Sequence, residues 1–168
     1  KTRLWVLARP MSGFAETFSH YVMEVSPGGG SSSPEPDPTA QAVLFVVGGM
    51  GKIEIDGTIH DLMPGSYVYL APSTTWMFDN VGTEPVTFHW IRKRYQHAAG
   101  VAKPVSFVTS DDAVAPTPMP DTNGSWATSR FVEPDDLRHD MHVNIVSFDP
   151  GGHIPFAETH VMEHALYM

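Results

Sequence analysis

The sequence predicts an all-β protein built from antiparallel sandwiches or barrels. Three observations support this prediction. Short apolar, β-branched stretches recur about every 8 to 12 residues with turn residues between them, helical periodicity is nearly absent, and the two ends of the chain share a repeated unit. The 168 residues suffice for one ordinary domain, or for one complete domain and part of another.

Short strands are expected to fill most of the first part of the chain. Their predicted ranges are 4–8, 18–25, 41–47, 52–56, 58–62, 66–70, 74–80 and 85–92. Asp56-Gly57 predicts a two-residue hairpin, because both turn positions need positive φ. A loop of Gly, Ser, Pro and acidic residues follows the second strand at 26–38, and Pro64-Gly65 predicts a further turn.

The composition changes from about residue 97 to residue 124, where Ala, Pro, Ser, Thr and Asp dominate. This change indicates a connection between two units, within which Val105–Val108 can still pack as a strand. Pro134-Asp135-Asp136-Leu137 resembles the start of a short helix with acidic residues in its first turn. Strand alternation returns at 140–148.

One unit occurs twice along the chain. Val25-Ser26-Pro27-Gly28-Gly29 parallels Phe148-Asp149-Pro150-Gly151-Gly152, and Val43-Leu44-Phe45-Val46 matches Ala165-Leu166-Tyr167-Met168. The second copy stops inside a strand beyond which the first copy continues, so we expect the second barrel to be incomplete in this chain. The predicted parts are a first barrel at 1–98, a connection at 99–126, and the N-terminal part of a second barrel at 127–168.

Composition excludes several classes of function. The net charge of −9 argues against nucleic acid as a partner, because phosphate binding needs a basic surface. The absence of cysteine excludes disulfides, thiolate metal sites and a cysteine nucleophile. No apolar run approaches the roughly 20 residues of a membrane span, so we expect no membrane partner. The N-terminus carries no signal-peptide core and starts as if partway into a protein; we expect a cytoplasmic protein, with an earlier targeting segment left open.

Three residues near the C-terminus are candidate metal ligands: Glu158, His160 and His164. Side chains alternate between the two faces of an extended strand, so Glu158 and His160 point the same way. His164 joins them if the chain stays extended or turns back beside them. One carboxylate and two imidazoles suit a divalent first-row metal such as manganese, iron, cobalt or zinc. In the first copy of the repeat, prolines and an alanine fall opposite these ligands, so the fold alone does not require ligand-type residues there.

A lone histidine in an apolar strand is more often a buried, hydrogen-bonded side chain than a metal ligand. We assign this structural role to the isolated histidines His20, His60, His89, His97 and His153.

Three motifs resemble the (S)-ureidoglycine aminohydrolases, a family of bicupins in which one chain forms two small antiparallel barrels. The motifs are Glu158-x-His160-x-x-x-His164, the run from Phe88 to Tyr95, and the run from Leu137 to His142. The resemblance covers nearly the whole chain. The ligand motif departs from the usual cupin order, since Glu takes the place of the first His and His that of the Glu. In the first barrel Trp76 stands where a cupin ligand His is usual, so we expect that barrel to be metal-free.

The resemblance implies Mn²⁺ bound by Glu158, His160 and His164, with a fourth ligand, a Gln, beyond Met168. It also implies hydrolysis of (S)-ureidoglycine to (S)-ureidoglycolate and ammonia in purine breakdown. Glu158 is then also the candidate catalytic residue, as a proton acceptor. We further expect a homo-oligomer. Two alternatives stay open: a non-haem Fe(II) oxygenase, which also uses two histidines and a carboxylate, and a non-enzymatic cupin that binds a small ligand.

Overall fold

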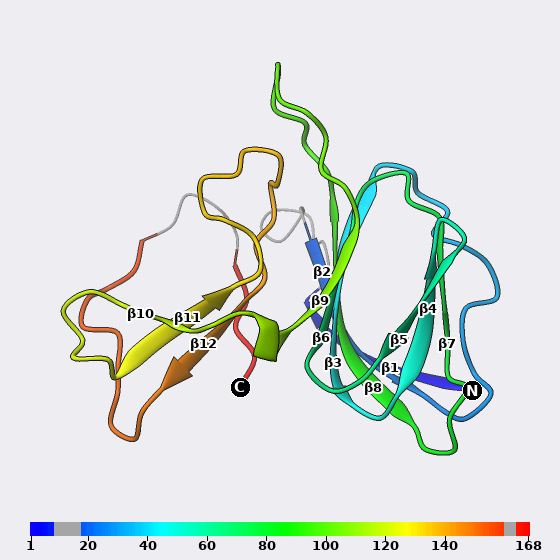
Figure 1. Cartoon of the computed structure of the whole chain (residues 1–168), viewed down its shortest axis with the longest axis horizontal. Helices are drawn as coiled ribbons and strands as arrows, with labels where there is room; N and C mark the ends of the chain where they lie inside the picture. Colours follow the sequence, from blue (N-terminus) through cyan, green and yellow to red (C-terminus); the bar gives the residue numbers. More distant parts are fainter. Residues whose placement is uncertain (9–17, 160–163) are drawn as a thin grey trace.

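Two antiparallel sheets form the larger of two units in the computed structural model, which describes residues 1–8, 18–159 and 164–168 (Figure 1). Six strands make one sheet in the order β1-β2-β8-β3-β6-β9, and three make the other in the order β5-β4-β7. The strands of these two sheets are β1 (Thr2–Ala8), β2 (Phe18–Val25), β3 (Ala40–Gly48), β4 (Gly51–Ile55), β5 (Thr58–Leu62), β6 (Ser66–Leu70), β7 (Trp76–Asp79), β8 (Val86–Arg94) and β9 (Phe107–Ser110). The prediction of an all-β, antiparallel fold is confirmed.

The predicted hairpin joins β4 to β5. Asp56 and Gly57 have φ values of 47° and 83°, and the pairing of Ile55 with Thr58 leaves these two residues as the turn. Gly65, with φ of 89°, makes the predicted turn before β6. Turn chemistry is local, and for this reason the sequence located these strands to within a few residues.

The core of the first unit lies between its two sheets. Leu44, Val68 and Phe88 project from the six-stranded sheet, and Ile53 and Phe78 project from the three-stranded sheet. These residues alternate with outward-facing neighbours along each strand, as an antiparallel sandwich requires.

The outer face of the six-stranded sheet is also covered. All five residues of β6 are buried, because Tyr67 and Tyr69 pack outward against the second unit while Val68 packs inward. Phe131 stacks on Tyr67 with ring centroids 4.0 Å apart and planes 9° apart. Aromatic stacking therefore joins the two units through this sheet.

The second unit contains a sheet of three strands, β10 (Thr117–Pro118), β11 (Trp126–Arg130) and β12 (Asn144–Phe148), in that order (Figure 1). β9, from the predicted connection, pairs with β6 and extends the sheet of the first unit. The domain boundaries at residues 98 and 126 stay predictions.

The short helix expected at Pro134 is wrong. Residues 134–138 form turns, in which Asp136 N–H donates to the Glu133 carbonyl and His139 N–H to the Asp136 carbonyl. The Asp136 carboxylate accepts from the Arg138 backbone N–H and guanidinium, so a side chain competes with the helical backbone bonds. Within the described residues the one helix is a 3₁₀ turn at Asp111–Ala113.

The described part of the chain contains no helix with the length and apolar character needed to span a membrane.

Candidate functional site

The predicted metal ligands lie near the C-terminal end of the second unit. Glu158 and His164 are both exposed. Neither residue belongs to a strand. The described residues around Glu158 therefore do not form the extended strand that the sequence predicted there. His160 lies outside the described residues, and the convergence of the three side chains stays a prediction. Among the described residues, no group of three or more His, Asp or Glu side chains lies close enough to hold a metal ion.

The chemistry of the donor set fits a divalent metal. A carboxylate oxygen from Glu158 and imidazole nitrogens from His160 and His164 are ligands that manganese, iron and zinc share.

The C-terminal segment contacts the first unit through Tyr167. The Tyr167 ring lies edge-on to His89, with centroids 4.5 Å apart, and 6.5 Å from the ring of His20. In the repeat, Tyr167 matches Phe45, which is the cross-strand neighbour of His89 in β3. The same outer sheet face therefore receives an aromatic ring from each copy of the repeated unit.

His20 and His89 are not isolated from each other, contrary to the expectation from sequence. Their ring nitrogens, Nε2 of His20 and Nδ1 of His89, share a hydrogen bond of 2.9 Å, and both side chains are buried. Burial lowers the pKa of His20 to about 4, helped by the neighbouring His89, and burial also lowers the pKa of His89. Both rings are thus neutral near pH 7, one donating to the other. Both histidines are buried and hydrogen-bonded, as the structural role assigned to them requires. The two residues are 69 positions apart in the sequence, and the pairing of β2 with β8 brings them together.

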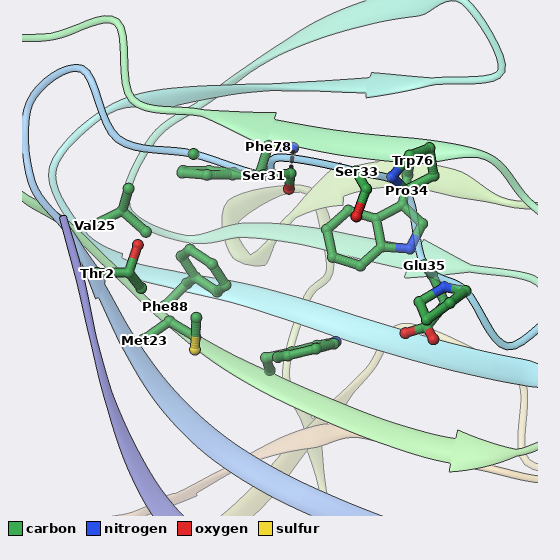
Figure 2. A pocket seen from close by; sticks show the side chains of 13 residues that line it. Thr2, Met23, Val25, Ser31, Ser33, Pro34, Glu35, Trp76, Phe78 and Phe88 are labelled. Carbon is green, nitrogen blue, oxygen red and sulfur yellow. Dashed lines mark hydrogen bonds between the residues drawn. The ribbon is translucent and has the colours of Figure 1, made fainter.

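A cavity of about 240 Å³ opens into the interior of the first unit (Figure 2). Met23, Phe88 and Trp90 reach it from the six-stranded sheet, and Trp76 and Phe78 reach it from the three-stranded sheet. The loop between β2 and β3 runs along its edge and contributes Ser31, Ser33 and Glu35. The lining is mainly apolar, and four of its thirteen residues are aromatic.

The lining residue Glu35 forms an ion pair beside this cavity. The Arg92 guanidinium donates from Nε and from a terminal nitrogen to the two carboxylate oxygens of Glu35, each at 2.8 Å. The Asp37 backbone N–H donates to the same carboxylate at 3.0 Å. These donors overcome the effect of burial and lower the pKa of Glu35. The carboxylate is therefore ionised and fully engaged near neutral pH.

Sequence reasoning missed this cavity. It placed no site in the first barrel, although it noted Trp76 where a ligand histidine is usual. The aromatic residues Trp76, Phe78, Phe88 and Trp90 alternate on their strands and were the available signal. Alternation shows that such residues face a common side, but only the packing of one sheet on the other brings the two Trp rings to a centroid distance of 6.0 Å.

Residues 21–92 match the family model of the cupin domain. This range runs from β2 to β8 and contains most of the cavity lining.

Curated relatives carry the name that the motifs suggested. An Escherichia coli (S)-ureidoglycine aminohydrolase is 25% identical over 163 residues, which are 97% of this chain and 60% of the relative. A rice protein, "Probable (S)-ureidoglycine aminohydrolase", is 28% identical over 140 residues, 83% of this chain and 43% of the relative. The chain thus spans about half of the length of the curated relatives it matches. The resemblance inferred from the motifs is confirmed.

Solved structures share the fold. A Pseudomonas aeruginosa protein named "Putative Glyoxylate Induced Protein" superimposes with a TM-score of 0.89 at 54% identity, over 96% of this chain and 60% of the other. An Escherichia coli protein superimposes with a TM-score of 0.79 at 23% identity, over 95% of this chain and 61% of the other. Both likenesses extend beyond the first unit, because each covers nearly the whole chain.

Proposed function

Because residues 21–92 belong to the cupin domain family and the chain is related along nearly its whole length to (S)-ureidoglycine aminohydrolases, we propose that this protein serves the hydrolysis of (S)-ureidoglycine. The products are (S)-ureidoglycolate and ammonia. The observation that carries the proposal is the 25% identity with the Escherichia coli enzyme of that name over 97% of this chain. The donor set near the C-terminus supports it, because its chemistry suits a divalent metal.

The reaction replaces an amine by a hydroxyl on a carbon that also carries a ureido group and a carboxylate. Glu158, His160 and His164 would hold Mn²⁺, which supplies a Lewis acid and a template for the substrate when bound. Glu158 has a second proposed role, because a carboxylate in reach of the incoming water can accept its proton. The imidazoles of His160 and His164 act as neutral donors, which requires both to be unprotonated.

The test compares Glu158→Ala with Glu133→Ala in the full-length protein. We expect Glu158→Ala to reduce bound manganese, measured by plasma mass spectrometry, and to slow ammonia release by more than about 100-fold, since even residues behind a ligand contribute 10- to 100-fold. Glu133 is an exposed carboxylate outside the donor set, so Glu133→Ala should change neither quantity. Full manganese content and full turnover in Glu158→Ala would contradict the assignment of this residue.

Two other outcomes separate the alternatives. Iron-dependent oxygen uptake without ammonia release would identify a non-haem oxygenase instead, because that chemistry uses the same kind of donor set. Ligand binding without turnover of ureidoglycine would identify a binding protein. Either result in the wild type would overturn the proposed hydrolysis.

A further inference from the structure

The start of β11 anchors the segment that carries Glu158. Asp149 N–H donates to the Ser125 carbonyl oxygen at 3.0 Å, and Gly152 N–H donates to the Asp149 carbonyl at 2.7 Å. A Cβ atom at Gly152 would collide with the same Ser125 oxygen, so the chain passes this carbonyl with no room for a side chain. The chain is thus tied to β11 shortly before it reaches Glu158.

Aromatic rings continue this anchor towards Glu158. Trp126, which is 5% exposed, stacks on its cross-strand neighbour Phe148, with ring centroids 6.2 Å apart and planes 21° apart. The ring of Phe156 lies on the same tryptophan, at 5.9 Å between centroids and 53° between planes. Only Ala157 separates Phe156 from Glu158, so a fixed Phe156 restricts the positions that the carboxylate can take.

The first copy of the repeat has the same anchor at its own strand β1. Ser26 N–H donates to the Lys1 carbonyl at 3.0 Å, and Gly29 N–H donates to the Ser26 carbonyl at 2.9 Å. A Cβ atom at Gly29 would lie 2.9 Å from the Ser26 oxygen and 3.2 Å from the Lys1 nitrogen, so this glycine is closely packed as well. The two hydrogen bonds and the tight glycine therefore belong to the repeated unit, in which β1 corresponds to β11.

This correspondence places Trp126 on the interior side of the second unit. Val25 parallels Phe148 in the repeat, and Thr2 pairs with Val25 as Trp126 pairs with Phe148. Thr2 and Val25 both line the cavity of the first unit (Figure 2). Trp126 and Phe148 therefore face the corresponding interior of the second unit.

The first copy also assigns a place to the ligand segment. In the alignment of the two copies, Pro34 falls opposite Phe156 and Pro36 falls opposite Glu158. Both prolines line the cavity of the first unit. The segment around Glu158 consequently belongs at the edge of the second unit's interior, on the side where Trp126 lies.

The second copy needs a restraint that the first copy has in its sequence. Pro34 and Pro36 fix their own backbone φ. Phe156 and Glu158 stand in their places without this limit, so a flexible ligand segment would have to be ordered each time an ion binds. Contact with the buried ring of Trp126 orders the segment in advance.

We propose that Trp126 is a positioning residue of the metal site, which seats Phe156 and thereby holds the backbone that presents the Glu158 carboxylate to the ion. Residues that orient metal ligands without touching the metal commonly set its affinity. This proposal rests on Glu158 being a metal ligand, as in the proposed function, and does not depend on which substrate is hydrolysed.

The test uses Co²⁺ alone as the probe, because the donor set suits it and because bound Co²⁺ quenches the fluorescence of a nearby tryptophan. Isothermal titration calorimetry of the metal-free, full-length protein should show saturable binding that Glu158→Ala removes. Phe156→Ala and Trp126→Leu should each weaken binding by about tenfold. The double variant should bind no more weakly than either single variant, because both changes remove the same contact.

Control variants distinguish loss of this contact from a general loss of stability. Phe156 is 59% exposed, so Phe156→Ala leaves the buried core intact, and Ile59→Ala, at a residue of β5 that is 62% exposed, should bind Co²⁺ like the wild type. Trp126→Phe keeps a ring against Phe156 and should retain the affinity while losing most of the quenching. Trp76→Phe, in the three-stranded sheet of the first unit, should retain both.

Three results would overturn the proposal while leaving the metal site in place. They are wild-type affinity in Phe156→Ala, additive losses in the double variant, and full quenching in Trp126→Phe. Absence of Co²⁺ binding to the wild type, or full binding by Glu158→Ala, would overturn the donor set and this proposal with it. A chain that shows the expected Co²⁺ results but releases no ammonia from ureidoglycine would contradict the proposed hydrolysis alone.

Discussion

At the scale of single residues, the histidine pair His20–His89 shows how burial sets a protonation state. The two rings hydrogen-bond to each other on the outer face of the six-stranded sheet, under Tyr167. Desolvation disfavours the charged form of each ring, and a second charge beside it would add repulsion. The pair is therefore a neutral unit whose stability depends on pH.

Stability should fall as the pH decreases from about 6.5 to about 4. The pKa of His20 is about 4 in the folded chain, against 6.5 when exposed, so in this range the unfolded chain binds the proton first. The loss attributable to His20 is at most about 3.4 kcal/mol, from 2.5 pKa units at 1.36 kcal/mol each. Urea denaturation at pH 7.5 and pH 5 measures the larger part of it.

His20→Gln should lose most of this pH dependence, because glutamine does not titrate. His153→Gln, at an exposed histidine, should retain it. An identical slope of stability against pH in His20→Gln and the wild type would show that other groups cause the dependence.

At the scale of elements, a polar anchor fastens the turns at 134–140 to the first unit. The Asp140 carboxylate accepts a hydrogen bond from the Gln41 amide, one from the Gln96 backbone N–H at 2.7 Å, and an ion pair from Lys93 at 2.5 Å. Tyr69 O–H in turn donates to Gln41 at 2.9 Å. Asp140 thus joins residues of β3, β6 and β8, which a free surface carboxylate would not do.

Asp140→Asn should destabilise the chain by about 1–3 kcal/mol. The neutral amide loses the ion pair with Lys93, and its NH₂ group cannot accept the hydrogen bonds that the carboxylate oxygen accepted. Asp61→Asn is the control: Asp61 also pairs with a lysine, Lys52 at 3.0 Å, but its side chain is 78% exposed, and such pairs contribute about 0–1 kcal/mol. Chemical denaturation of both variants measures the difference. Equal effects would mean that the Asp140 pair behaves as a surface ion pair.

At the scale of the whole molecule, the two units are held together by the outer face of one sheet. Phe131 enters between Tyr67 and Phe45, with ring centroids at 4.0 Å and 6.4 Å. The six-stranded sheet consequently serves two cores, one inside the first unit and one between the units. Large aromatic contacts of this kind dominate the energy of such interfaces.

Phe131→Ala should loosen the second unit while the interior of the first unit stays ordered. Removing a packed Phe costs about 3–5 kcal/mol when it is fully buried, and Phe131 is half-buried, so about 2–3 kcal/mol is expected. Hydrogen exchange should accelerate at β11 and β12 and remain slow at β3 and β8. Ile59→Ala, at a side chain of β5 that is 62% exposed, should change neither region.

The sequence was sufficient for the first eight strands, because their alternation and the Asp56-Gly57 and Pro64-Gly65 turns are local signals. It did not locate β10, whose two residues carry no period, or β11, which has a single large apolar residue. It also predicted a helix where the Asp136 side chain competes for backbone donors. For the site, the sequence supplied the donor set Glu158, His160 and His164 and the family resemblance. Both could be recognised because the residues that carry them lie close together in the chain.

By itself the sequence determined the class of fold, the strands of the first unit and the residues that suit a metal, because each depends on neighbours a few positions apart. Only the tertiary structure decided that His20 meets His89, that Phe131 lies on Tyr67, and that Trp76 and Trp90, which belong to different sheets, meet beside one cavity. These contacts join residues on different strands, and their distances follow from strand pairing and sheet packing, which no short stretch of sequence specifies.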